Sequence, residues 1–163
     1  MTTKSEVRIK AVRANDIPEL LSLGDAARLS HWSTENYLDE LNNPSAILLK
    51  LTANDNATLG FIVGRLVPGG VIDVVTDAEI YNVTVKAAFR RRGLGQMLFD
   101  GFLDHCRQRE VANVWLEVRE SNAAAIAFYE NNGFRSVHTR KNFYRDPVEN
   151  ALLMRLALKE PNA

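Results

Sequence analysis

The first half of the chain alternates hydrophobic and polar positions in short blocks, which predict strands and helices in turn. Val7, Ile9 and Ala11 are separated by charged residues, and this spacing of two is typical of a strand. The elements expected after it are, in chain order, a helix starting at Asn15-Asp16, a short helix capped by Ser33 and ended by Asn42-Asn43-Pro44, strands over 46–52 and 58–67 joined by a hairpin turn at 54–56, and a further turn at Pro68-Gly69-Gly70.

The second half changes to a pattern in which strands and helices alternate. Its expected elements are, in chain order, a strand over 78–85, a helix over 93–109, a strand over 114–118, a helix over 122–132, and final strands at Val137 and over 151–158. Gly133 fits the left-handed position that ends a helix, and Phe134 is expected to fold back onto that helix. A strand-helix-strand unit in a chain rich in hairpins predicts an α/β fold with a mixed sheet flanked by helices. Because no repeat or long linker interrupts the pattern, we expect residues 1–163 to form a single domain.

Composition and charge narrow the class of protein. A chain of 163 residues can bury a core large enough to fold without disulfides or metal. The single cysteine, Cys106, cannot form an internal disulfide, which favours a reducing, cytoplasmic location. There is no signal-peptide pattern and no apolar run of about 18 residues, so neither secretion nor a membrane partner is expected. Lys and Arg (20) balance Asp and Glu (20), which argues against direct nucleic-acid binding and leaves the function to a local site.

The turn between the expected strand 78–85 and helix 93–109 is a candidate anion site. It consists of Arg90, Arg91, Arg92, Gly93, Leu94, Gly95 and Gln96. Backbone N–H groups at a helix start lack intrahelical partners, so a glycine-containing entry flanked by arginines can hold a pyrophosphate. The turn is not a dinucleotide fingerprint, because Leu98 stands at the third glycine position, and it lacks the Gly-Lys-Ser/Thr of a P-loop. A solvated basic turn before an ordinary helix is the alternative.

Two side chains are candidates for acid–base chemistry. Glu117 is a carboxylate in an otherwise apolar strand, where partial burial would raise its pKa toward that of a general base and a nearby arginine would lower it again. Asn122, Ala125 and Tyr129 align on one face of the following helix, so Asn122 can hydrogen-bond an amide and Tyr129 can present a phenol. The alternatives are a salt-bridged Glu117 at a strand end and a Tyr129 packed in the core with its hydroxyl at the surface.

The remaining reactive side chains indicate no second site. Cys106 lies late in its helix, so a buried apolar role is expected rather than a nucleophilic one. The histidines His31, His105 and His138 have no metal-ligand spacing, and no metal is expected. Four acidic residues either line a path for a peptide or are solvated, namely Glu35, Asp39, Glu40 and Glu120.

Several of these stretches together resemble the GCN5-related N-acetyltransferases. They are the strand over 81–85, the turn over 90–96 and residues 115–129, WLEVRESNAAAIAFY. The last stretch is the more specific one, and it is similar to the bacterial ribosomal-protein-alanine N-acetyltransferases. Trp32-Ser33, residues 140–144 (RKNFY) and residues 149–154 (ENALLM) extend the resemblance over most of the chain.

The resemblance implies a fold, a cofactor and roles for the candidate residues. It implies a seven-stranded mixed sheet with about four helices, which opens between the strands ending at Val85 and Val118 to hold acetyl-CoA. The implied cofactor contacts are the main chain of Val83, Thr84 and Val85, the turn Arg90, Arg91, Arg92, Gly93, Leu94, Gly95 and Gln96, and Asn122. Glu117 would be the general base and Tyr129 the general acid. The implied reaction is direct acetylation of the N-terminal α-amino group of a protein, with a small-subunit ribosomal protein as the expected substrate.

Two other functions stay open at this point. An enzyme of the same fold could acetylate a small-molecule amine, although Trp32-Ser33 and Phe143-Tyr144 favour a peptide. The chain could also be a non-catalytic CoA-binding regulatory domain, against which the presence of both Glu117 and Tyr129 argues.

Overall fold

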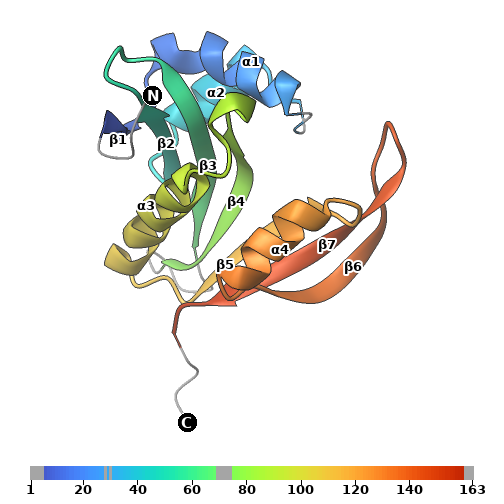
Figure 1. Cartoon of the computed structure of the whole chain (residues 1–163). Coiled ribbons are helices and arrows are strands. Elements are labelled where there is room, and N and C mark those ends of the chain that lie inside the picture. The colour runs from blue at the N-terminus through green and yellow to red at the C-terminus, as the bar shows by residue number, and fades with distance from the viewer. Residues whose placement is uncertain (1–5, 28, 30, 69–74, 160–163) are drawn as a thin grey trace. The chain divides into compact units, whose positions relative to one another are not determined.

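The computed structural model describes residues 6–27, 29, 31–68 and 75–159 (Figure 1). Its helices and strands are, in chain order, β1 (Arg8–Ala11), the short 3-10 helix η2 (Ala14–Asp16), α1 (Ile17–Ala26), α2 (Thr34–Leu41), β2 (Ala46–Thr52), β3 (Thr58–Pro68), β4 (Val75–Val85), η3 (Ala87–Phe89), α3 (Leu94–Gln108), β5 (Asn113–Arg119), α4 (Ala123–Asn131), β6 (Arg135–Tyr144) and β7 (Glu149–Ala157). These elements confirm the predicted α/β class and nearly all of the predicted order. The expected turn residues Gly69 and Gly70 lie outside the described residues.

The strands form one mixed sheet of seven, in the order β1-β2-β3-β4-β5-β7-β6. The pairs β1–β2, β2–β3, β5–β7 and β6–β7 are antiparallel, whereas β4 and β5 are parallel. The parallel register runs from Asp77 opposite Asn113 to Ile80 opposite Leu116. Because β4 continues to Val85 and β5 to Arg119, each strand extends beyond the pairs described between them.

The chain divides into two compact units, of which the first comprises Met1–Arg65 and Tyr81–Gln108. Neighbouring residues of β2 point to opposite faces of the sheet, because side chains alternate along a pleated strand. Leu48 belongs to a buried cluster with Leu20 and Tyr37 of α1 and α2. Leu49 faces α3 instead, since a Cβ placed on Gly101 would lie 3.5 Å from its Cδ1 atom. The sequence pattern of β2 therefore places α1 and α2 against one face and α3 against the other.

Local capping explains where the helices of the first unit begin. Ser33 accepts a hydrogen bond from Asn36 N through its hydroxyl, while Asn36 Oδ1 accepts one from Ser33 N at 2.9 Å. This reciprocal pair satisfies two donors at the start of α2, as the sequence predicted for Ser33. Pro18 occupies the first turn of α1, where its missing N–H is not needed.

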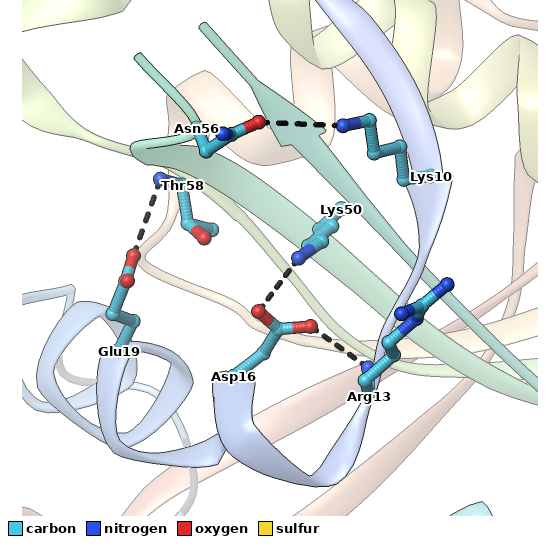
Figure 2. Close-up of polar contacts among 7 residues, drawn as sticks. All are labelled: Lys10, Arg13, Asp16, Glu19, Lys50, Asn56 and Thr58. Carbon is cyan, nitrogen blue, oxygen red and sulfur yellow. Dashed lines mark hydrogen bonds and ion pairs between the residues drawn. The ribbon is translucent and has the colours of Figure 1, made fainter.

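Charged side chains tie the start of α1 to the strands beside it, as Figure 2 shows. Asp16 accepts hydrogen bonds from Lys50 Nζ at 2.6 Å and from Arg13 N at 2.8 Å. Glu19, one turn further on, accepts a hydrogen bond from Thr58 N at 3.1 Å. Burial acts to raise the pKa of Asp16, but the hydrogen bonds from Lys50 and Arg13 outweigh it and hold that pKa below its ordinary value. These contacts fix α1 against β2 and β3.

The second unit comprises Leu66–Ile80 and Arg109–Ala163 and contains α4 beside β5, β7 and β6. The end of α4 follows the prediction for Gly133, which has a φ of 94°. Gly133 N donates to Glu130 O and Phe134 N donates to Tyr129 O, both at 3.0 Å, and these two bonds define a Schellman motif. Phe134 is 2% exposed and its ring centroid lies 5.8 Å from that of Tyr129. The helix end thus fixes Tyr129 in the core of this unit.

The largest difference from the prediction is β6. The expected strand at Val137 is a ten-residue strand, Arg135–Tyr144, and its first nine residues are all exposed. An edge strand with both faces in solvent has no hydrophobic alternation, so the sequence pattern could not indicate its length. Among the described residues, no helix has the length and hydropathy required to cross a membrane.

Candidate active site

The turn after β4 has the backbone shape of an anion site. Arg91 and Gly93 have positive φ values of 62° and 75°, and α3 starts at Leu94, one residue later than predicted. Alternation between left-handed and right-handed residues turns successive N–H groups to one side, which favours an anion. Arg90 donates from Nε to Val85 O at 3.0 Å, and Arg92 lies 5.3 Å from the ring centroid of Phe89. These contacts hold Arg90 and Arg92, and all three arginines of the turn are exposed.

At the end of β4, backbone N–H and C=O groups point to both sides of the strand. Lys86 N donates to Leu59 O of β3 at 2.7 Å, and a Cβ on Gly60 would lie 2.6 Å from Thr84 O. Residues 84 and 86 therefore direct their backbone groups toward β3. Since alternate residues of a strand direct their backbone groups to opposite edges, Val83 and Val85 direct theirs away from β3.

In the second unit, β5 alternates as the sequence predicted, and Glu117 lies on its less buried face. Glu117 Oε1 forms an ion pair with Arg140 Nη1, at a distance of 3.1 Å. Glu117 Oε2 is buried and has no hydrogen-bond partner among the described residues. Burial raises the pKa of Glu117 above its ordinary value, Arg140 opposes this shift, and the nearby charge of Glu79 adds to it. A carboxylate whose pKa is raised is a stronger base than an ordinary one.

Tyr129 and Asn122 stand at opposite ends of α4. Tyr129 is 8% exposed, and burial raises its pKa to about 12, with a smaller contribution from Tyr144. Asn122 precedes the helix as its cap and accepts a hydrogen bond from Ala125 N at 3.2 Å. The predicted alignment thus contains one buried phenol and one exposed amide whose oxygen already caps the helix.

Tyr144 and its neighbours complete the polar groups around Glu117, although the sequence linked Tyr144 only to a peptide substrate and not to the ionisation of Glu117. Burial raises the pKa of Tyr144, and the charge of Glu117 raises it further. The Arg119 guanidinium lies 4.2 Å from the Tyr144 ring centroid and contacts Glu149 Oε2 at 3.2 Å. Tyr144 and Glu149 stand in the two stretches near the end of the chain that carry the family resemblance, which was the available signal for them.

Other candidate residues divide between confirmed and corrected predictions. Cys106 is fully buried and burial raises its pKa to about 12, which confirms the apolar role. Glu40 was expected on a peptide path or in solvent, and this is wrong because it is 4% exposed and forms an ion pair with Arg65. In the described part of the chain, no cluster of His, Cys, Asp and Glu is arranged to hold a metal ion.

Comparisons with known proteins agree on one family. The model of the family described as "Acetyltransferase (GNAT) family" matches residues 15–134. The ribosomal protein bS18-alanine N-acetyltransferase of Salmonella typhimurium is 35% identical over 153 residues, which cover 92% of this chain and 97% of that protein. The crystal structure of the ribosomal-protein-S18-alanine N-acetyltransferase from Escherichia coli has 30% identity and a TM-score of 0.81, with 96% of each chain covered. The crystal structure of Ard1 from Thermoplasma volcanium has 29% identity and a TM-score of 0.83, and covers 95% of this chain and 99% of its own.

The sheet order, the turn before α3 and these similarities support one conclusion. The matched region runs from the start of α1 to the end of α4 and covers well over half of the chain. This chain therefore belongs to the acetyltransferase (GNAT) family.

Proposed function

We propose that this acetyltransferase moves the acetyl group of acetyl-CoA to the N-terminal α-amino group of a protein. The proposed substrate is a ribosomal protein whose N-terminal residue is alanine. The names of the relatives from Salmonella typhimurium and Escherichia coli support this substrate class. The observation that carries the chemistry is Glu117, whose Oε2 atom is buried and has no described partner although the opposite oxygen is paired. In this proposal both units belong to one catalytic domain.

Acetyl-CoA would be held by the first unit. The N–H groups of the turn from Arg90 to Gln96 and the start of α3 would bind the pyrophosphate, with the exposed Arg90, Arg91 and Arg92 as the nearby cations. The main chain of Val83 and Val85 would pair with the amide groups of the pantetheine arm, while Thr84 keeps that segment on β3. Val85 O already accepts a hydrogen bond from Arg90 Nε, so Val85 would take part through its N–H group. Backbone N–H groups there would also polarise the thioester carbonyl. Asn122 would contact the cofactor through its amide nitrogen, since its oxygen caps α4.

An N-terminal amine suits the modest base that Glu117 provides. With a reference pKa near 8, about a tenth of an α-amine is neutral at pH 7, against roughly 0.04% of a lysine amine with a pKa near 10.4. Glu117 would take the amine proton through Oε2, directly or through one water. The nitrogen would attack the thioester carbon, the carbon–sulfur bond would break, and the amide would form without an acyl-enzyme intermediate.

Tyr129 would return a proton to the departing sulfur. Its pKa of about 12 keeps the phenol protonated throughout the physiological range, so it is available as a donor. The proton that Glu117 removes and the proton that Tyr129 gives balance over one turnover, because solvent exchange restores both groups. Direct transfer is also consistent with Cys106, which is buried in α3 and unavailable as a nucleophile.

Release of free CoA measured against a panel of amines tests the proposal. The panel should contain a peptide with a free N-terminal alanine, the same peptide with a blocked N-terminus and an internal lysine, and small polyamines. We expect kcat/KM for the free N-terminus to exceed the others by at least about 100-fold, which corresponds to about 2.7 kcal/mol of transition-state discrimination. A preference for a polyamine would contradict the protein substrate, and no CoA release with any amine would contradict catalysis itself.

A further inference from the structure

The two carboxylate oxygens of Glu117 have different surroundings. Oε1 is 3.1 Å from Arg140 Nη1, whereas Oε2 is buried and has no hydrogen-bond partner among the described residues. The Arg140 side chain is 48% exposed and that of Glu117 is 26% exposed. The contact therefore lies at the boundary between the unit's interior and solvent, with Arg140 on the more exposed side.

The contact depends on strand pairing rather than on sequence proximity. Glu117 of β5 lies opposite Leu153 of β7, and Arg140 of β6 lies opposite Ala151 of the same strand. Arg140 thus reaches diagonally across β7, where the small Ala151 side chain leaves room, and its guanidinium also lies 5.7 Å from the Phe143 ring centroid.

The charged and titratable groups around Glu117 come from each neighbouring strand. Glu79 of β4 disfavours the ionised form of Glu117, and Tyr144 of β6 is close enough for the Glu117 charge to affect its own ionisation. On β7 the residue opposite Glu117 is Leu153, which is uncharged, and His138 of β6 lies one strand further away, opposite Leu153. Arg140 is the cation whose charge lowers the pKa of Glu117, against the increases caused by burial and by Glu79.

We propose that Arg140 is a positioning residue for the reaction, which keeps Glu117 ionised through Oε1 and thereby leaves Oε2 as the single oxygen that accepts the substrate's amine proton. This inference rests on the proposed role of Glu117 as the base. A base that is protonated at neutral pH cannot act, and a base with both oxygens paired has no site for the amine. The Arg140 contact satisfies both requirements because it binds one oxygen and leaves the other free. The guanidinium also contacts the ring of Phe143, which holds it near Glu117.

The test compares Arg140→Gln, Arg140→Lys and the control Arg135→Gln with the unmodified enzyme. Arg135 lies on the same exposed strand but outside the Glu117 cluster, so its variant controls for the general loss of one positive charge. Glu117 is titrated by NMR of its carboxyl carbon, and kcat/KM for the peptide is measured from pH 5.5 to 9. The three arginine variants all keep Glu117, so the substrate's own amine contributes the same limb to each of their profiles and to that of the unmodified enzyme, and differences among them report the enzyme.

In Arg140→Gln we expect Glu117 to titrate about one pH unit higher, the lower end of the effect of an adjacent opposite charge. The acidic limb of kcat/KM should move in the same direction, so that the rate on that limb, relative to its pH 9 value, falls by up to about tenfold. Arg140→Lys should restore most of this shift, and Arg135→Gln should leave both curves unchanged.

Two results overturn the inference. One is an unchanged titration of Glu117 in Arg140→Gln, and the other is an equal shift in Arg135→Gln. Glu117→Gln tests the proposed function separately, because full activity in that variant would refute the role of Glu117 as the base. The NMR titration would still report whether Arg140 controls the ionisation of Glu117.

Discussion

Replacing Tyr129 with phenylalanine removes a single oxygen from the packed side of α4. The ring centroids of Phe128 and Phe134 lie 5.7 Å and 5.8 Å from that of Tyr129, and a phenylalanine preserves both aromatic contacts. The loss is limited to the hydrogen bonding of one hydroxyl, which contributes about 0.5–1.5 kcal/mol to stability. For a chain of this size, the melting temperature should fall by no more than about 6 °C.

The expected effect on catalysis is larger. A positioned general acid typically contributes about 10²–10⁴-fold. A thiol has a reference pKa near 8.5, so a thiolate leaves with little assistance at neutral pH, and we expect a fall in kcat near the lower limit, about 100-fold or 2.7 kcal/mol. Because burial raises the pKa of Tyr129 to about 12, the phenol stays protonated up to pH 10. The ratio of wild-type to variant kcat should therefore be constant from pH 7 to 10.

Steady-state kinetics with the alanine peptide, together with calorimetric titration of CoA, would measure these quantities. Tyr37→Phe is the matched control, because Tyr37 is also buried with a pKa raised by burial to about 12 but belongs to α2 in the first unit. A Tyr129→Phe enzyme with kcat within twofold of the wild type would refute the general-acid role. So would a fall in kcat that Tyr37→Phe reproduces, because the effect would then belong to folding.

Three further predictions concern the base, the end of α4 and the contacts around α1. Glu117→Gln should lower kcat/KM at pH 7 by about 100-fold and recover up to about tenfold by pH 9, where the neutral fraction of an α-amine rises from about a tenth to about nine tenths; a pH-independent deficit would indicate a structural carboxylate. Gly133→Ala should destabilise the fold by about 1–2 kcal/mol in urea unfolding, because its φ is 94° and the new Cβ would lie 3.1 Å from Leu156 Cδ1; unchanged stability would contradict the Schellman geometry. Asp16→Asn should cost about 1.5–3 kcal/mol at pH 7 through the lost charged hydrogen bond to Lys50. Since folding depresses the Asp16 pKa, its stabilisation is present above the unfolded value near 3.9 and is lost as pH falls through the folded value. The free energies of unfolding of wild type and variant should therefore converge as the pH falls through that lower range.

Much of the fold was predictable because the signals are local. Ser33 caps α2 and Gly133 ends α4 where the sequence indicated, and the alternation of β5 places Glu117 on its less buried face. Each of these features depends on backbone geometry within a few residues, so a single sequence is sufficient to indicate it.

The parts of the site that escaped prediction depend on long-range register. The contact between Glu117 and Arg140 exists because β7 pairs with both β5 and β6, and the exposed strand β6 carries no periodicity that would reveal this. The burial of Glu40 likewise depends on Arg65, which is 25 residues away in sequence. Pairwise electrostatics across strands therefore requires the structure, whereas helix ends and turns do not.

Tandem mass spectrometry after incubation with acetyl-CoA tests the proposed substrate most directly. The substrate should be a ribosomal protein or peptide that carries both a free N-terminal alanine and internal lysines. We predict one acetyl group, located on the α-amino nitrogen of the alanine and formed about 100-fold more slowly when Glu117→Gln replaces the enzyme at pH 7. Acetylation confined to lysine side chains, or an unmodified N-terminus under conditions in which the enzyme acetylates a small amine, would contradict N-terminal protein acetylation.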